Sequence, residues 1–287
     1  MILLRGKICL LLSAFIYGLA PVLAKLAYGG GVNVMTLTFL RTFLMLPVLF
    51  VLMFFRKQSF RLTKRELFSI AALGFVGGTL SIVLLYGAYE YISTGLATTL
   101  HFVYPLIIVI VSALIYKEEI TKPKLLAVML VTAGIFLFVD LNDTADKIGV
   151  ILALLSGIFY SFYVIYMDRS GIDKMDYVKL TFYLMLIMSA GTLAFGAASG
   201  DIDFSQMNAS AWGYSALISF LITIGAIPLF QAGVRYEGAS TAGIVSAFEP
   251  ITTIILGMLF LGETMNIAQY IGGAAIIAGV IITEKYG

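Results

Sequence analysis

The sequence predicts an all-α integral membrane protein in which ten transmembrane helices form two inverted five-helix repeats. Three observations lead to this prediction. The first is composition: 61% of the 287 residues are hydrophobic and only 12% are charged, with a mean hydropathy of +1.02, whereas a soluble domain carries roughly 25% charged residues. The second is the length of the apolar runs, about 20 residues, which suits membrane-spanning helices. The third is an internal repeat.

The repeat is visible as identical residues at a constant separation, which we call the long offset. It places Tyr91–Glu118 over Tyr236–Glu263. The identical pairs include Tyr91 and Tyr236, Ala97 and Ala242, Pro105 and Pro250, Glu118 and Glu263, and Ala133-Gly134 and Ala278-Gly279. A looser match at a slightly shorter separation, the short offset, pairs Leu11-Leu12-Ser13 and Tyr17 with Leu154-Leu155-Ser156 and Tyr160. Repeats at 1–143 and 144–287 are therefore expected, with a cavity between them.

The first span begins after Arg5 and Lys7 and resembles a signal peptide. Its apolar run continues to about Tyr28, which is too long for an ordinary signal sequence, and no small-x-small cleavage site follows. We therefore interpret it as an uncleaved first span.

The other spans are separated by connections too short to hold a soluble domain. Pro123 is placed at a helix start, where its missing N–H costs little, and Thr121 and Asn266 are predicted N-caps at matching places in the two halves. The ten spans are predicted near 8–27, 34–55, 67–89, 94–115, 123–140, 148–167, 177–197, 212–234, 238–261 and 267–283.

Lysine and arginine residues predict the orientation. If the N-terminus is cytoplasmic, all but three of the 18 cations lie inside, and the exceptions are Lys25, Arg41 and Lys147. The positive-inside rule favours this arrangement. Both termini are then cytoplasmic, and the odd number of spans in each half inverts the second repeat. The short loops suggest a multi-pass protein of a prokaryotic cell (inner) membrane.

Charged residues within the spans are candidates for function, because each costs free energy in lipid unless it is paired or hydrated. Arg41 and His101 lie roughly 10 Å below the outer surface, counted at 1.5 Å per residue. Lys25 and Glu90 lie at outer helix ends, and Glu249 lies near the middle of span 9.

Each of these residues has two interpretations. Arg41 binds a substrate carboxylate or phosphate through a bidentate fork, or it is a permanent structural partner of Glu90 or of helix-end carbonyls. Lys25 assists it or extends to the membrane surface. Glu249 binds a substrate amine or exchanges a proton, or it is a hydrogen-bonded packing residue. His101 relays protons and contacts substrate, or it is a satisfied core residue.

Two prolines predict helix kinks beside this chemistry. Pro250 follows Glu249 and frees the carbonyl of Ser246, four residues earlier. Pro105 predicts the same kink in span 4, where Tyr104 stands in place of a glutamate. Tyr17 and Tyr160 are repeat mates that either wall the cavity with Tyr104 or pack at the membrane interface. Glu118 and Glu263 suit a structural role before helix starts.

These residues resemble the drug/metabolite transporter superfamily, EamA type, over essentially the whole chain. The resemblance is carried by Tyr17-Gly18, Lys25, Arg41, Pro105 and Glu118, followed by Glu249-Pro250 and Gly262-Glu263. Where family members often have Trp-Gly, this chain has Tyr17-Gly18. The resemblance implies a basket-like helical bundle that transports small metabolites, often by exporting amino acids.

The sequence thus predicts a secondary transporter of a small polar metabolite, an amino acid or related zwitterion, that works in the lipid bilayer by alternating access, with protons as possible coupling ions. Export of such a solute is favoured over transport of phosphorylated sugars or nucleotide sugars, which need several cations. An intramembrane enzyme is disfavoured, because no Gly-x-Ser-x-Gly motif accompanies His101. We expect no catalytic residue, metal or cofactor, and a net charge of +2 gives no sign of nucleic acid binding.

Overall fold

The computed structural model describes residues 2–92, 94–137, 146–262 and 266–286, and all regular secondary structure within these ranges is helical. The first half of the chain contains α1 (Ile2–Tyr28), α2 (Val34–Phe43), α3 (Leu46–Phe55), α4 (Lys64–Ala71), η1 (Ala72–Leu80), α5 (Ser81–Ala88), α6 (Thr94–His101), α7 (Tyr104–Leu114) and α8 (Lys122–Phe136). The second half contains α9 (Lys147–Arg169), η2 (Ile172–Lys174), α10 (Tyr177–Ser199), α11 (Ala209–Phe220), η3 (Leu221–Ala226), α12 (Ile227–Ser246), α13 (Phe248–Leu261) and α14 (Ile267–Tyr286).

The described residues include seven helical stretches that are long and apolar enough to cross a membrane. They are Gly6–Tyr28, Val34–Phe55, Lys64–Ala88, Leu96–Leu114, Lys147–Arg169, Tyr177–Ser199 and Ala209–Ser246. These stretches cover seven of the ten predicted spans. The other three predictions fall on α8, on the end of α12 together with α13, and on α14. Of these, Phe248–Leu261 and Ile267–Thr283 are apolar but shorter.

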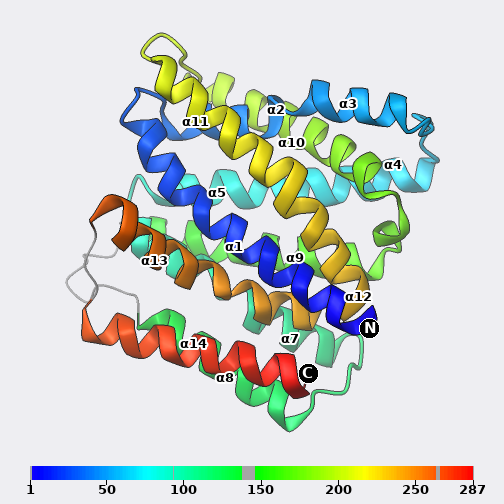
Figure 1. The fold of residues 1–287 in the computed structure, drawn as a ribbon, viewed down its shortest axis with the longest axis vertical. Coiled ribbons are helices and arrows are strands. Elements are labelled where there is room, and N and C mark those ends of the chain that lie inside the picture. Colours follow the sequence, from blue (N-terminus) through cyan, green and yellow to red (C-terminus); the bar gives the residue numbers. More distant parts are fainter. Residues whose placement is uncertain (1, 93, 138–145, 263–265, 287) are drawn as a thin grey trace.

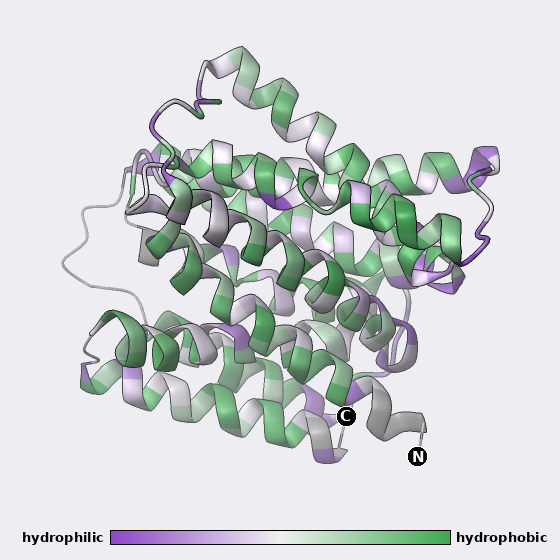
Figure 2. Ribbon diagram, turned by 45° about the horizontal axis from the view of Figure 1, so that its top comes forward, coloured by the Kyte–Doolittle hydropathy of each residue, from purple (hydrophilic) through white to green (hydrophobic). Residues whose placement is uncertain are grey.

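Apolar side chains cover the outside of the bundle. Figure 2 shows hydrophobic residues along the helices and hydrophilic residues gathered mainly at the connections between them. Phe54, Phe68 and Leu114 are 67%, 72% and 76% exposed, which in water would leave a large unfavourable surface. The chain is therefore a multi-pass membrane protein whose surface is solvated by lipid. Both termini lie at the same end of the bundle (Figure 1).

Both predicted N-caps are confirmed. The Thr121 hydroxyl accepts a hydrogen bond from the Lys124 backbone N–H at 3.3 Å, and the Asn266 side chain accepts one from Gln269 N–H at 2.9 Å. Each bond satisfies a backbone donor that the first helical turn leaves without a partner.

The last helices of the two halves, α8 and α14, pack side by side at the edge of the molecule (Figure 1). A Cβ added at Gly134 would lie 2.6 Å from the carbonyl oxygen of Gly272, and one added at Gly279 would lie 2.7 Å from that of Ala127. The long offset relates Gly134 to Gly279 and also Ala127 to Gly272. The same backbone contact is therefore made twice.

The first helix of each half packs on the other half. Helix α1 contacts α11, η3, α12 and α13, whereas α9 contacts η1, α5, α6 and α7. The two contact sets involve corresponding segments of the two halves. This exchange brings residues from four long helical regions to the middle of the bundle.

The third span of each half contains a π-helical stretch. These stretches, η1 and η3, occupy overlapping positions when the halves are aligned at the long offset. A π-helical turn adds a residue to the helix and is frequent near functional sites. Both stretches contact the first helix of the opposite half.

Candidate functional site

Two broken helices position the polar residues of the bundle centre. Helix α6 ends at His101 and α7 begins at Tyr104, with Pro105 at its second position. Helix α12 ends at Ser246 and α13 begins at Phe248, so that Glu249 and Pro250 lie in its first turn. The predicted kinks at both prolines are confirmed, because proline lacks the N–H that would continue the helix.

The first helix of the second half meets one of these breaks. The Ser161 hydroxyl of α9 lies 3.4 Å from the Tyr104 carbonyl and also donates to the Gly157 carbonyl at 2.8 Å. A Cβ at Gly157 would lie 2.6 Å from the carbonyl oxygen of His101. Helix α9 therefore approaches the α6–α7 break closely at Gly157 and Ser161. Tyr160 lies between these two residues and is placed beside the break.

Helix α1 meets the other break in the same way. A Cβ at Gly18 would lie 2.6 Å from the Glu249 carbonyl oxygen, and the Thr253 hydroxyl donates to the Gly18 carbonyl at 2.9 Å. The short offset relates Gly18 to Ser161, and the long offset relates Tyr104 to Glu249. The two crossings are thus equivalent, and Tyr17 is placed beside Glu249.

Aromatic side chains fill the space around the α6–α7 break. The Tyr104 and Tyr160 rings meet edge to face at 4.7 Å between centroids, and Tyr160 stacks on Tyr163 at 5.7 Å. The His101 ring lies 5.4 Å from Tyr160 and 5.6 Å from Tyr104. Three predicted site residues are therefore in direct contact.

The His101 ring is held in one orientation. Its Nδ1 lies 2.9 Å from the Ser156 hydroxyl, which itself donates to the Ala153 carbonyl at 2.6 Å. Because this hydroxyl has only one hydrogen, it accepts from Nδ1–H of the imidazole.

Arg41 enters from α2, one turn before a helix break that the sequence analysis did not predict. Helix α2 ends at Phe43, and α3 begins at Leu46 with Pro47 at its second position. Hydroxyls of Ser219 and Thr223 lie 2.9 and 3.4 Å from the Arg41 carbonyl oxygen. This anchors the backbone, and within the described residues no hydrogen bond or ion pair occupies the guanidinium.

Arg41 and Glu249 lie within electrostatic reach of each other. Tyr17 lies within the same reach of Arg41, and Tyr104 and Tyr160 lie within that of Glu249. We call these five residues the central cluster. They come from both halves of the chain and from five helices, α1, α2, α7, α9 and α13.

Three further tyrosines, which sequence reasoning missed, adjoin the central cluster. Tyr28 and Tyr89 lie within electrostatic reach of Arg41, and Tyr86 packs on Tyr89 at 5.5 Å between ring centroids. The Tyr89 hydroxyl lies 3.2 Å from that of Thr98. These side chains extend the cluster toward the ends of α1 and α5. The signal was present as tyrosines near the predicted outer ends of the spans.

Two predicted site residues lie at the edge of this region. Lys25 is exposed in the last turn of α1, and Glu90 is exposed after the end of α5. The structure therefore does not bring them into the central cluster.

A separate polar clamp joins the halves at the end of the bundle that holds the termini. Glu118 accepts from Lys124 Nζ and from Arg169 Nη2, both at 2.8 Å. Burial tends to raise the pKa of the Glu118 carboxyl, but the hydrogen bond and charge of Lys124, with Arg169, outweigh it and hold that pKa below its usual value. This agrees with the structural interpretation of Glu118. Its repeat mate Glu263 lies outside the described residues.

The surface depressions described next do not involve the central cluster. Two shallow ones are found among the described residues, at Phe54–Phe60 and at Lys122–Leu126 with Ile282, and neither includes a residue of the central cluster. Over the same ranges, no group of three His, Cys, Asp or Glu side chains is arranged to hold a metal ion.

Comparison with known proteins gives consistent results. The model of the EamA-like transporter family matches residues 4–140 and again 147–284. An uncharacterized transporter of Archaeoglobus fulgidus is 27% identical over 98% of this chain and 96% of its own length. The uncharacterized transporter YetK of Bacillus subtilis is 27% identical over 82% of this chain and 74% of its own.

A solved crystal structure resembles the fold. It has a TM-score of 0.79 and covers 97% of this chain and 96% of its own, at 15% sequence identity. At that identity the likeness concerns the fold alone.

Proposed function

The chain belongs to the EamA-like transporter family, and on that premise we propose that it exports a small zwitterionic metabolite, an amino acid or close analogue. One observation carries this proposal. Arg41 and Glu249 lie within electrostatic reach of each other in the bundle interior, yet within the described residues no hydrogen bond or ion pair joins their side chains. A solute with both charges would complete this arrangement.

Each residue of the central cluster contacts a different part of the solute. The Arg41 guanidinium holds the carboxylate of the solute through two parallel hydrogen bonds, and Glu249 holds its amine. Tyr17, Tyr104 and Tyr160 form the walls, with flat apolar faces and polar hydroxyl tips. His101 contributes its imidazole ring from the side of Tyr104 and Tyr160.

Glu249 is also the proposed site of proton coupling. When the solute leaves, the carboxylate loses its cationic partner, and uptake of a proton lowers the cost of keeping it in the interior. His101 and the exposed Glu90 are further proton carriers, respectively beside the tyrosines and near the mouth. Net export would then be linked to proton entry.

The proposed cycle is alternating access between two inverted five-helix repeats, 1–143 and 144–287. The reciprocal contacts at Gly134 and Gly279, and at Gly18 and Ser161, support this organisation. Ten spans with both termini in the cytoplasm follow from the same repeat and from the positive-inside rule.

Phosphorylated sugars and nucleotide sugars rank second as substrates. Dianionic phosphates usually require several cations, and the central cluster contains one, Arg41. Lys25 would have to move inward from its exposed position to supply a second.

The test is flux in proteoliposomes with a panel of amino acids, amines and sugar phosphates. For a transported amino acid, Arg41→Lys should reduce the transport efficiency about ten- to a hundred-fold, as expected for losing a charge-assisted bidentate contact. Glu249→Gln should abolish acceleration by a proton gradient, because the amide cannot exchange a proton.

Arg65→Lys and Glu119→Gln are the matched controls, since both residues are exposed outside the cluster. They should leave flux unchanged. Wild-type kinetics in Arg41→Lys and Glu249→Gln would remove both residues from the site, and flux of sugar phosphates alone would reverse the substrate ranking.

A further inference from the structure

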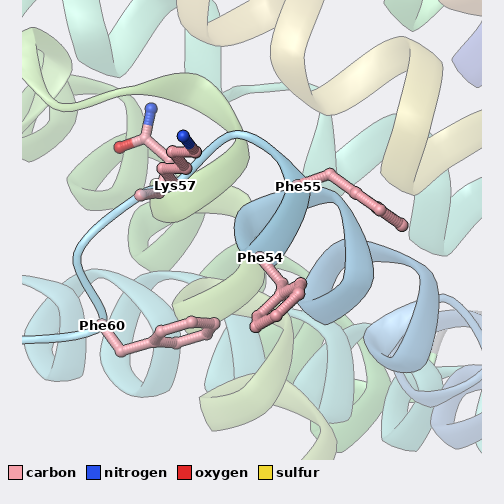
Figure 3. Close-up of a pocket in the computed structure, with 5 residues that line it drawn as sticks. Phe54, Phe55, Lys57 and Phe60 are labelled. Carbon is pink, nitrogen blue, oxygen red and sulfur yellow. The ribbon is translucent and has the colours of Figure 1, made fainter.

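The end of α3 forms a depression that the proposed transport function does not use. Its volume is about 410 Å³, and Phe54, Phe55, Lys57, Gln58 and Phe60 line it. Figure 3 shows the rings of Phe54 and Phe60 on the same side of the α3 end, with Lys57 on the turn next to them. The C-terminal end of α3 lies at the end of the bundle that holds both termini (Figure 1).

Lys57 has a backbone conformation that favours glycine. Its φ is +53°, and the turn that it forms is closed by bonds from Lys57 N–H to the Phe54 carbonyl and from Gln58 N–H to the Met53 carbonyl, each 3.0 Å. This is a Schellman motif, in which the left-handed position is usually glycine. A residue with a Cβ is strained there, so the lysine side chain is retained at a cost.

The corresponding position in the other half is a glycine. The short offset relates Lys57 to Gly200, which has φ +78° after α10. The same exchange occurs at Lys117, with φ +54°, and its mate at the long offset, Gly262, with φ +67°. Lysine thus occupies both strained positions at the end with the termini, and glycine occupies their mates. The turn conformation therefore does not account for lysine at these two positions.

The segment that follows Lys57 is held against α10. Lys179 Nζ donates to the Arg61 carbonyl at 2.7 Å, the Tyr183 hydroxyl donates to the Phe60 carbonyl, and the Phe60 ring packs on Phe50 at 5.1 Å between centroids. The aromatic floor of the depression is therefore preformed and loses little conformational entropy when a ligand binds.

Charge at the rim points to an anion. Arg56 is paired with Asp176 at 4.0 Å, but no hydrogen bond or ion pair is found for the Lys57 side chain among the described residues. Phe54 and Phe55, which also line the depression, are 67% and 76% exposed. A ligand with an anionic group on an apolar chain would match both the lysine and the exposed phenylalanine rings. A phospholipid in the adjacent leaflet has this chemistry.

We propose that this depression binds an anionic phospholipid, with its phosphate on Lys57 and Gln58 and its acyl chain over the phenylalanine rings. The site is independent of the solute site, and its occupant comes from the bilayer.

The test measures lipid binding to the purified protein in dodecyl maltoside by native mass spectrometry. Dioleoylphosphatidylglycerol should bind more tightly than dioleoylphosphatidylcholine. Lys57→Gly should weaken the phosphatidylglycerol complex about five-fold, as expected for one lysine near a lipid phosphate. Its melting temperature without added lipid should be unchanged or higher, because glycine relieves the strained turn, so that a folding defect is distinguishable from lost binding.

Lys117→Gly is the matched control, since it removes the same charge from the same backbone conformation outside the depression. It should retain the preference for phosphatidylglycerol, and Phe60→Ala should weaken both lipids alike. Equal affinity of wild type for the two lipids, or wild-type affinity in Lys57→Gly, would overturn the proposal.

Discussion

At the crossing of α1 and α13, Gly18 has no side chain, so the α13 backbone at Glu249 can approach α1 closely. Any larger side chain there would meet the Glu249 carbonyl and Thr252, whose Cβ would lie 2.6 Å from an added methyl group. Neither neighbour is the end of a flexible side chain, so relief requires α1 or α13 to move. The position of Glu249 therefore depends on Gly18, a residue that has no side chain to contact the solute.

Gly18→Ala should destabilise the protein by about 1–3 kcal/mol, the usual cost of overpacking, and should reduce transport by displacing Glu249. Thermal unfolding in detergent measures the first effect. Gly213→Ala on α11 is the control, because a Cβ there meets nothing within 4 Å and should be neutral or slightly stabilising. A Gly18→Ala protein as stable as Gly213→Ala would contradict the close crossing.

Residue chemistry predicted Arg41, Glu249, Tyr17, Tyr104 and Tyr160 as site residues, and the structure places these five near one another. Rare charges in apolar sequence are a strong signal, because lipid penalises them. The adjoining tyrosines were harder to recognise. Tyrosine is common at membrane interfaces, and only the packing of the helices separates those near Arg41 from those that face lipid. Lys25 and Glu90 were predicted at outer helix ends, and both are exposed there.

Among the elements, the kinks at Pro105 and Pro250 were predictable, since a missing N–H acts locally. Pro47 carried the same signal, but span 2 was predicted as one helix and is two, α2 and α3. The π-helical stretches η1 and η3 had no local signal. The position of a π-helical turn depends on the helices that pack around it, and these neighbours cannot be read from the sequence.

The clamp between α8 and α9 gives a pH-dependent prediction. Glu118→Gln should lower stability at pH 7 by about 0.5–1 kcal/mol, a modest value because 24% of the Glu118 side chain meets solvent. The folded-state pKa lies below the ordinary value of 4.5. The contribution of the carboxylate is therefore full above pH 4.5 and is lost as the pH falls through the folded-state pKa.

Thermal unfolding of wild type and Glu118→Gln at pH 7 and at pH 3.5 measures this dependence. The difference between the two proteins should shrink at the lower pH. Glu119→Gln, at the exposed neighbouring position, should differ little from wild type at either pH. A Glu118→Gln deficit that is as large at pH 3.5 as at pH 7 would show that the clamp acts through packing and not through charge.

At the scale of the whole molecule, the repeat and the membrane class were readable from the sequence. Constant separations such as that of Pro105 and Pro250 survive because both halves need the same kink. The pairing of α1 with the spans of the opposite half was not readable, because a separation relates equivalent residues and says nothing about which of them touch.

The proposed orientation can be checked by labelling in whole cells. In a Cys9→Ser background, a membrane-impermeant maleimide should label Ser205→Cys, between α10 and α11, without permeabilisation. Lys64→Cys, at the start of α4, should react only after the membrane is permeabilised. Both residues are exposed, so accessibility in the protein does not limit the reaction. The opposite pattern would place the termini outside.

The equivalent crossings of α1 and α9 differ in one respect, since Glu249 stands where the other half has Tyr104. For two identical halves, exchanging their conformations would convert an inward-open protein into an outward-open one of equal energy. Because one half has a carboxylate where the other half has a phenol, the two states differ in energy. On the proposed cycle, the empty carrier therefore rests with one side open, and reversing direction requires the solute or a proton to offset that bias.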